Sequence, residues 1–382
     1  MYFVTLVLKN LLRRKIRTSL TVIGNSIAVL VVICLVGIST DFRDSLIRSY
    51  EKRGVDLIVV RSGRTERLTS KIDQNVAQQI LAIPGVAEVE GGLVEIVSSD
   101  EANLTMMPMM GRTADSFLMR ELTILKGRVL RPEDTQSCLL GALVADQLNK
   151  QPGDTLELEG EPFKVLGVYE SYNSFDNSAV MVLRSELQRL FDSVGQVTGF
   201  SVRLDPLLDD PDLSKRVETQ IEALDDKGGK SWNLSAMPTR DFMNTTVQMR
   251  AAVSMGWVTS AIALFIGAVG MLNTMLMSVF ERTKEIGILR ALGWRKSRIL
   301  AMILLESFAL SAAGAVTGIV SAWVLVNILH QIHLFRIAVP PHLNLLAITQ
   351  GCLIAVMVGA IGGIYPAMRA MQIAPTEAIR HE

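Results

Sequence analysis

The chain has 382 residues, of which 49% are hydrophobic, and its mean hydropathy is +0.34. This mean lies between the values of soluble domains and of wholly membrane-embedded proteins, and the apolar blocks lie at the two ends of the chain, so we expect a membrane protein with a large soluble insertion. The 38 basic and 38 acidic residues cancel, and the lack of a basic excess argues against a nucleic-acid partner.

The first apolar run, residues 18–40, predicts a transmembrane helix that follows a cytoplasmic tail over residues 1–17. The run is uncharged and about 23 residues long, enough to cross roughly 30 Å of hydrocarbon. A cleaved signal peptide has an apolar core of only about 7–15 residues, so we interpret the run as an uncleaved helix. No helix breaker stands between Asp41 and Gly54, so the helix is expected to continue outward as a stalk.

Residues 41–250 have the composition of a folded α+β domain. Alternating and β-branched apolar runs predict strands, and a Pro-Gly-Asp turn precedes a predicted hairpin. Residues 72–83 have helical periodicity, with Asp73 as a candidate N-cap. The predicted strands are 56–60, 86–97, 155–158, 163–169 and 200–204, and a second helix is predicted over 214–224.

Three further apolar runs predict membrane helices, because each exceeds the roughly 18 residues that a span requires. They cover residues 251–280, 299–329 and 345–368, and residues 239–250 are expected to extend the first of them as a second stalk. The expected fold class is a membrane protein with four transmembrane α-helices and a large α+β extracytoplasmic domain inserted between helices 1 and 2. The remaining segments are a cytoplasmic segment over 281–298, an outer loop over 330–344 and a cytoplasmic C-terminal tail over 369–382.

Basic residues fix the orientation, since short cytoplasmic segments carry an excess of Lys and Arg. The N-terminal tail has five basic residues and no acid, and the 281–298 segment has six basic residues against two acids. The 330–344 loop carries only Arg336. Both termini and the 281–298 segment are therefore expected in the cytoplasm, with the inserted domain on the other side of the membrane.

Two further features lie within the predicted spans. Small residues four apart, Gly314 with Gly318 and Gly359 with Gly363, predict faces on which helices pack closely. Glu306 is the one acid inside a predicted span. An intramembrane acid is either functional or simply hydrated or hydrogen-bonded to another helix, and the sequence leaves these alternatives open.

The segment over residues 281–293, with the sequence ERTKEIGILRALG, resembles the cytoplasmic segment of the FtsX/MacB family of ABC transporter permeases. The C-terminal run PTEAIR over 375–380 is similar to the ending of that family, with Ala374 and Ile379 where an acid and a leucine are usual. The inserted region resembles a MacB-like periplasmic core domain, on the pairs Gly111-Arg112, Gly127-Arg128 and Gly153-Asp154 and the run 165–168.

The resemblance implies a permease subunit and no enzyme activity in this chain. An ABC ATPase subunit would bind ATP, so no cofactor is expected here. ATP hydrolysis would move the outer domain for export or extraction of a drug, peptide, lipoprotein or lipid-like substrate. The implied partners are a second permease in a homodimer or heterodimer, membrane lipids and, in some assemblies, a periplasmic adaptor or outer-membrane channel, and the implied location is the bacterial inner membrane. An alternative is an FtsX-like regulatory scaffold that transmits motion to a cell-wall hydrolase or sensor; a membrane sensor without an ATPase is a third.

Alone, the 281–298 segment predicts an amphipathic helix lying at the lipid headgroups. The resemblance favours a coupling helix that docks on the ATPase, with apolar anchors, and Gly293 is expected to end the helix. The candidate ATPase-coupling residues are Glu281, Arg282, Glu285, Ile286, Gly287, Leu289, Arg290, Ala291, Leu292 and Gly293, and Ile288 shares the apolar side.

Two other patterns carry no site. The run Gly229-Lys230-Ser231 imitates the end of a phosphate-binding loop, but Leu224 stands where that loop needs a glycine. His330, His333 and His342 are loosely spaced with no carboxylate nearby, so no metal site is expected.

Overall fold

The computed structural model describes residues 15–62, 71–99, 104–208, 210–225, 229, 231–245, 247–331 and 345–373. The described chain divides into two compact units. One, the membrane unit, comprises residues 15–41, 252–331 and 345–373, and the other, the outer domain, lies within residues 42–251. His333 and His342 lie outside the described residues, as does Lys230 of the Gly-Lys-Ser run.

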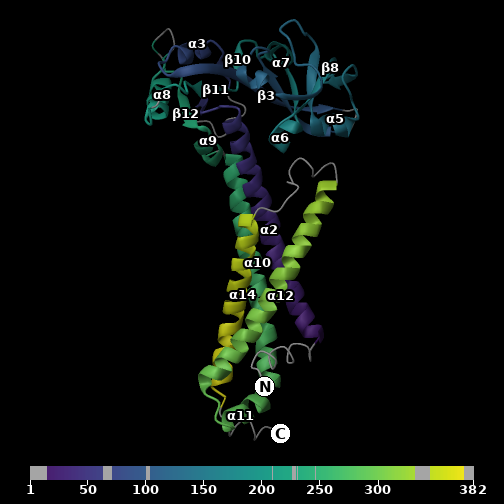
Figure 1. Ribbon diagram of the computed structural model, residues 1–382, viewed down its shortest axis with the longest axis vertical. Coiled ribbons are helices and arrows are strands. Elements are labelled where there is room, and N and C mark those ends of the chain that lie inside the picture. The colour runs from purple at the N-terminus through teal and green to yellow at the C-terminus, as the bar shows by residue number, and fades with distance from the viewer. Residues whose placement is uncertain are drawn as a thin grey trace. The chain divides into compact units, whose positions relative to one another are not determined.

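The membrane unit is built from four long helices and one short one (Figure 1). Each long helix, within the described residues, contains a stretch long and apolar enough to cross a membrane, which confirms the predicted fold class. The helices are α2 (Lys15–Lys52), α10 (Val247–Glu281), α12 (Lys296–Gln331) and α14 (Leu345–Met371), with α11 (Thr283–Ala291) as the short one.

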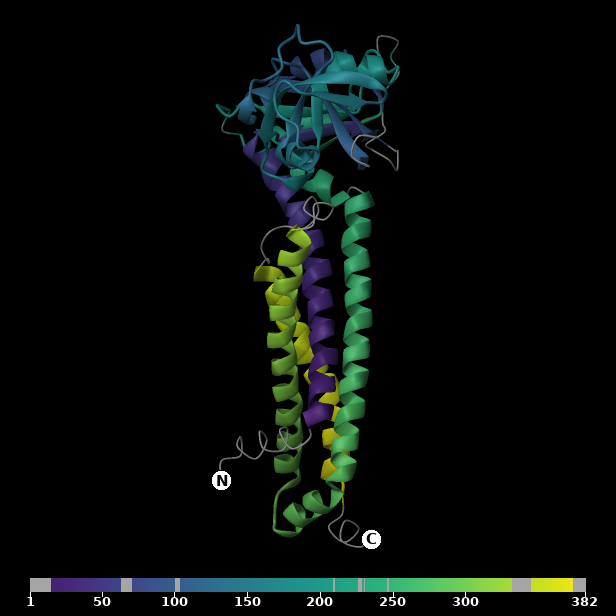
Figure 2. The ribbon, with the colours of Figure 1, turned by 90° about the vertical axis from the view of Figure 1, so that its right-hand side faces the viewer.

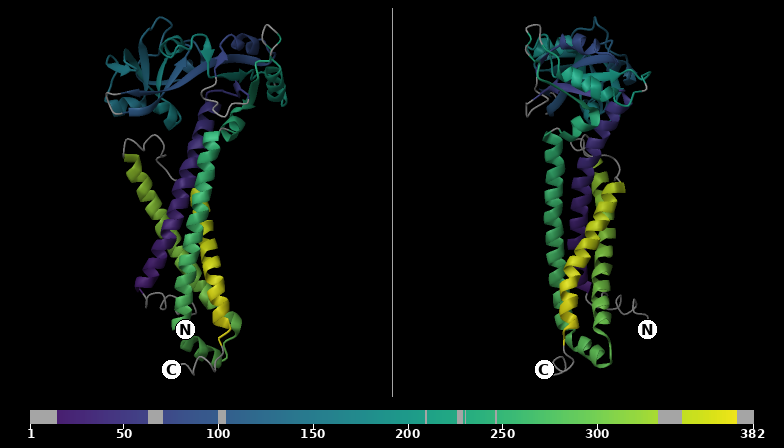
Figure 3. Two further views of the ribbon diagram at one scale, coloured as in Figure 1. Left: turned by 180° about the vertical axis from the view of Figure 1, so that it is seen from behind. Right: turned by 90° about the vertical axis from the view of Figure 1, so that its left-hand side faces the viewer.

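Glycines set how closely the long helices approach. A Cβ atom on Gly314 of α12 would lie 2.7 Å from the Asn25 Cβ of α2, and one on Gly318 would lie 2.8 Å from the Ser26 carbonyl oxygen. Gly267 of α10 faces Ala28 of α2, and these two helices run side by side in both views of Figure 3. Close backbone approach of this kind is how helices associate where lipid removes the hydrophobic drive.

The outer domain is organised around one twisted sheet (Figure 2). Among the described residues its strand order is β12-β1-β11-β3-β4-β9-β6-β8-β5, with β7 paired to β8. The strands are β1 (Leu57–Arg61), β3 (Val86–Ser99), β4 (Leu104–Arg112), β5 (Thr123–Gly127), β6 (Ser137–Gly141), β7 (Thr155–Leu158), β8 (Glu161–Glu170), β9 (Val180–Leu183), β11 (Gly199–Leu204) and β12 (Leu234–Pro238).

Two apolar cores cover different parts of this sheet. Beside β1 and β11, α3 (Val76–Leu81) and α8 (Leu213–Glu222) bury Ile80 and Val217. Beside β4, β6, β8 and β9, α5 (Ala142–Leu148) and α7 (Arg184–Leu190) bury Val144 and Leu187. The remaining short helices are α4 (Phe117–Arg120), α6 (Ser174–Asn177) and α9 (Thr239–Thr245).

The predicted hairpin is confirmed, because β7 and β8 pair antiparallel with Leu156 opposite Phe163. The helix predicted over residues 72–83 is wrong at its start. Residues Ile72–Asp73 form strand β2, which pairs with β10 (Gln196–Val197), and the helix begins only at Val76. Asp73 does not cap it; its carboxylate instead accepts a hydrogen bond from the Asn75 backbone N–H at 2.8 Å.

The last turns of α2 belong to the outer domain. Leu46 and Ile47 are buried there, in a cluster with Val55, Phe117 and Phe242. Charged contacts fix the end of the helix in the same domain: Arg203 of β11 donates from Nη2 to the Arg53 carbonyl at 2.6 Å, and Arg53 pairs with Asp176 at 2.8 Å. Helix α2 thus runs without interruption from Lys15 into the outer-domain core.

Candidate functional site

The candidate site is the short helix α11 and its two junctions. The helix spans nine residues, Thr283–Ala291, and is therefore shorter than the 281–298 segment in which it was expected. It ends because Gly293 adopts a positive φ of 90°, which residues with a Cβ rarely adopt. The Gly293 and Trp294 N–H groups then donate to the carbonyls of Arg290 and Leu289, both at 3.1 Å, and so satisfy groups at the helix end.

One face of α11 packs on the membrane unit. Ile286 is 2% exposed and Gly287 is also buried, while Leu289 is partly buried. Ile286 and Leu289 join a cluster that includes Ile299 and Met302 near the start of α12. Ile286, Gly287 and Leu289 therefore hold α11 against its own chain in this structure.

The opposite face of α11 is exposed. Ile288 is 52% exposed, and Leu292, the C-cap residue directly after the helix, is 75% exposed. Lys284, Glu285 and Ala291 are exposed too. The face thus combines two large apolar side chains with a charged turn at its start, a composition suited to contact with another protein.

Two ion pairs join the junction between α10 and α11 to other helices, and a third, between Arg282 and Glu285, lies within the junction itself. Arg17 of α2 donates two hydrogen bonds to the Glu281 carboxylate, at 3.1 and 2.6 Å. Arg282 donates from Nη1 to Oε1 of Glu306 at 2.8 Å and from Nε to Oε2 of Glu285 at 3.0 Å. The intramembrane acid thus has a basic partner on the junction, 24 positions earlier in the chain.

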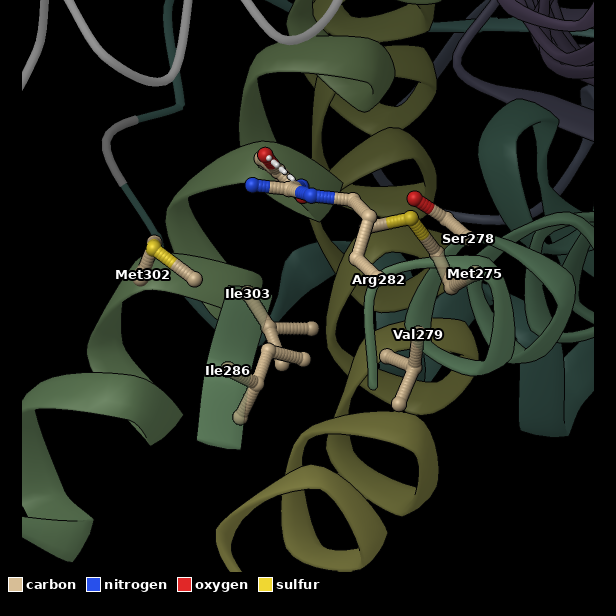
Figure 4. A pocket seen from close by; sticks show the side chains of 8 residues that line it. Met275, Ser278, Val279, Arg282, Ile286, Met302 and Ile303 are labelled. Atoms are coloured by element: carbon tan, nitrogen blue, oxygen red, sulfur yellow. Dashed lines mark hydrogen bonds and ion pairs between the residues drawn. The ribbon is translucent and has the colours of Figure 1, made fainter. Parts of the chain in front are cut away.

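Figure 4 shows Arg282 above the apolar side chains of Val279, Ile286 and Ile303, with its bond to Glu306 drawn as a dashed line. The space between them is a shallow depression with no room for a water molecule. Burial opposes the charge on Arg282, but the carboxylates of Glu306 and Glu285 outweigh it and raise the pKa of Arg282 above its ordinary value. The guanidinium therefore stays charged at any physiological pH.

The other expected coupling residues are less constrained. Ala291 and Gly293 are exposed. Arg290 is partly buried, and its Nε has no hydrogen-bond partner within the described chain. No group of three or more His, Cys, Asp or Glu side chains with the geometry of a metal site occurs in the part of the chain that the structure describes.

The sequence pointed to Glu281, Arg282 and Glu306 one by one but did not pair them, and it gave Arg17 only a role in topology. A usable signal was present. Arg17 and Glu281 are opposite charges at the cytoplasmic ends of two predicted helices, and Glu306 lies two turns inside a third. Unlike charges at matching membrane depth are candidates for a pair.

Comparison with known families settles the class. A family model described as a MacB-like periplasmic core domain matches residues 18–224, more than half of the chain, and a model of the FtsX-like permease C-terminal region matches residues 257–375. The chain belongs to the MacB/FtsX family of ABC transporter permeases. This permease is accordingly a multi-pass protein of the inner membrane, and α11 lies in its FtsX-like part.

Relatives of this permease match along nearly its whole length. It is 24% identical over 393 residues to an uncharacterised ABC transporter permease of Methanocaldococcus jannaschii, covering 99% of this chain and 98% of that one. It is 26% identical over 407 residues to the macrolide export ATP-binding/permease protein MacB of Bdellovibrio bacteriovorus, covering 98% of this chain but only 61% of that protein. The periplasmic region of MacB from Actinobacillus actinomycetemcomitans matches 53% of this chain at 15% identity, with a TM-score of 0.40.

Proposed function

We propose that this permease couples ATP hydrolysis by a separate ATPase subunit to movement of its outer domain. The movement would serve export or extraction of a drug, peptide, lipoprotein or lipid-like substrate. Membership of the family and the relatives named for macrolide export support this proposal. No metal or organic cofactor of its own is needed, because the permease would act through motion alone.

One observation carries the proposal: α11 presents Ile288 and Leu292 outward while Ile286 anchors it inward. Burying two such side chains in a partner would contribute about 1.5–3 kcal/mol each. Exposed leucine and isoleucine on a helix beside charged residues suit a groove with an apolar floor and a polar rim. The ATPase is the partner we assign to this face.

The outer domain would receive the motion through α2, whose last turns lie in its core. A regulatory scaffold for a cell-wall hydrolase would use the same coupling and would differ only in what the outer domain acts on. A related permease chain is the expected second copy, because ABC ATPases would act as a pair on two coupling helices.

The test begins with the tagged permease purified from its own host, where mass spectrometry identifies a bound ABC ATPase. The two purified subunits are then combined in nanodiscs and their affinity is measured with a non-hydrolysable ATP analogue. We expect Leu292→Asp and Ile288→Asp each to weaken binding by about tenfold or more. Leu207→Asp is the matched control, because Leu207 is 89% exposed but lies in the outer domain, against 75% for Leu292. Equal affinity of the parent and Leu292→Asp would contradict the assigned docking face.

A further inference from the structure

Two adjacent residues at the start of α11 contact two different helices. Glu281 is the last residue of α10 and is paired with Arg17 of α2. Arg282 follows it and is paired with Glu306 of α12. Because α11 begins at Thr283, both ion pairs lie at the junction through which α11 joins the bundle. The junction is therefore bonded to α2 and α12 as well as being covalently continuous with α10.

The two ion pairs differ in how hard they are to separate. The side chains of Arg282 and Glu306 are 11% and 5% exposed, so parting them would leave a buried charge without compensation. Those of Arg17 and Glu281 are 29% and 30% exposed, and water can replace either partner. Arg17 nevertheless donates two hydrogen bonds to the Glu281 carboxylate, and this bidentate contact orients the two side chains more strictly than a single hydrogen bond would.

The ion pair of Glu281 with Arg17 joins the junction to a helix that continues into the outer domain, and the ion pair of Arg282 with Glu306 does not. Helix α2 carries Arg17 in its first turn, and the same helix carries Leu46 and Ile47, which are buried in the outer-domain core. Helix α2 is one continuous helix from Lys15 to Lys52, so Arg17 and the outer-domain residues Leu46 and Ile47 belong to the same helical segment. Helix α12 has no such continuation into the outer domain within the described residues.

We infer that Glu281 and Arg282 form a charged joint that fixes the base of α11 to α12 and passes its displacement to α2. Arg282 and Glu306 position α11, and Arg17 and Glu281 connect it to the helix that enters the outer domain. All four are positioning residues, because none of them belongs to the docking face assigned to the ATPase. The inference rests on the proposed function for the claim that the ATPase moves α11. The ion pairs that form the joint are observed in this chain and do not depend on that claim.

The first test needs no ATPase. Hydrogen–deuterium exchange is measured on the full chain in nanodiscs of phosphatidylethanolamine and phosphatidylglycerol, following the α11 amides. Glu306→Gln should speed their exchange by about tenfold or more, because Arg282 loses its buried counter-charge. Arg240→Gln, which removes the exposed pair of Arg240 with Glu51 in the outer domain, is the control and should leave α11 unchanged. Unchanged α11 exchange in Glu306→Gln would overturn the joint.

The second test separates connection from docking. In nanodiscs that contain the ATPase, Arg17→Glu should keep the affinity for the ATPase within about twofold of the parent, since Arg17 is outside the docking face, but should lower permease-stimulated ATP hydrolysis by about tenfold. The double variant Arg17→Glu/Glu281→Arg should restore stimulation, because it rebuilds the pair with reversed charge. Failure of the double variant to restore stimulation, or a parallel loss of affinity in Arg17→Glu, would overturn the connecting role.

The outcomes of the two tests distinguish this inference from the proposed function. If the parent permease binds no ATPase, the proposed function fails and the connecting role fails with it. The exchange experiment still decides, in that case, whether the ion pair of Arg282 with Glu306 holds α11 in place.

Discussion

A Cβ atom added to Gly363 of α14 would lie 2.3 Å from the hydroxyl oxygen of Ser307 on α12. One turn earlier, a Cβ on Gly359 would lie 2.6 Å from the hydroxyl oxygen of Ser311. The added Cβ on Gly363 would also lie 2.7 Å from the Ser307 Cβ, which rotation of the serine hydroxyl cannot relieve, so Gly363 is required there; at Gly359 the Ser311 Cβ is 3.1 Å away and the fit is tight. Two glycine–serine pairs therefore set the distance between α12 and α14 at their cytoplasmic halves.

Gly363→Ala should destabilise the membrane unit by about 1–3 kcal/mol, because the added methyl group forces α14 away from α12. Thermal unfolding of the full chain in detergent, followed by helix content, measures the effect. Gly270→Ala in α10 is the control, since no heavy atom lies within 4 Å of its added Cβ. Gly363→Ala combined with Ser307→Gly should recover most of the loss, and a double variant no more stable than the single one would refute the pairing.

A second prediction concerns the end of α11. Gly293 has a φ of 90°, which proline cannot adopt and which costs an alanine about 1–2 kcal/mol. Gly293→Pro should therefore disrupt the end of the helix and abolish binding of the ATPase, whereas Gly293→Asn should retain most of the binding because asparagine tolerates positive φ. Binding by Gly293→Pro equal to that of the parent, in a protein that still folds, would show that the turn is not needed for docking.

A feature could be predicted from the sequence when the residues that determine it are close together along the chain. Span length and charge bias are local, and they predicted the four helices and the inserted domain. The β7–β8 hairpin was predictable for the same reason. The helix at residues 72–83 was misplaced because Ile72, Val76 and Ile80 are all buried at helical spacing, yet Ile72 is buried from a strand paired with β10.

The candidate site needed information that no local pattern holds. Arg17 and Glu281 are 264 positions apart, and their pairing follows from how α2 packs on α10. The sequence analysis placed Ile286, Leu289, Leu292 and Ile288 on one apolar side of the segment, and this was wrong: Ile286 and Leu289 face the bundle, whereas Ile288 and Leu292 are exposed. Residues two apart on a helix point in nearly opposite directions, so the spacing separates Ile286 from Ile288 but does not say which of them faces the bundle. That division depends on the turn at Gly293 and on the position of α12.

A third prediction concerns pH. In the outer domain, the side chain of Arg128 donates two hydrogen bonds to Asp134, at 2.5 and 2.7 Å, and lowers the pKa of that carboxyl from 3.8 to about 2. A carboxyl whose folded pKa is depressed stabilises the fold above its unfolded pKa and loses that contribution as the pH falls through the folded value. The contribution of Asp134 should therefore be complete above pH 4 and should disappear as the pH approaches 2.

Asp134→Asn should accordingly destabilise the outer domain at neutral pH, and the difference from the parent should shrink between pH 4 and pH 2. Unfolding of the full chain at several pH values, read from amide exchange in β5 and β6, measures it. Asp115→Asn, at an exposed carboxyl in the same domain, is the control and should show no comparable change. A difference for Asp134→Asn that stays constant with pH would exclude the ion pair as its cause.

The last prediction tests the buried pair that fixes the end of α2. The Arg53 and Asp176 side chains are each 8% exposed and 2.8 Å apart, and Arg53 also donates to the Ser171 hydroxyl at 2.6 Å. Removing one partner leaves a buried charge uncompensated, so Asp176→Ala should cost about 3–5 kcal/mol. Replacing both, as Arg53→Met/Asp176→Leu, should cost less than either single change, because no charge is then left in the interior.

The matched comparison is the exposed pair of Arg240 with Glu51, at 3.0 Å and with side chains 69% and 47% exposed. A double-mutant cycle on that pair should give a coupling of less than about 1 kcal/mol, against about 2 kcal/mol or more for Arg53 with Asp176. The unfolding free energies needed for both cycles are measured from the slowest-exchanging amides of the outer domain, in the full chain and in the same buffer. Equal coupling in the two cycles would show that the Arg53–Asp176 pair does not hold the helix end, and would leave that role to the packing of Leu46 and Ile47 and to the hydrogen bond from Arg203 to the Arg53 carbonyl.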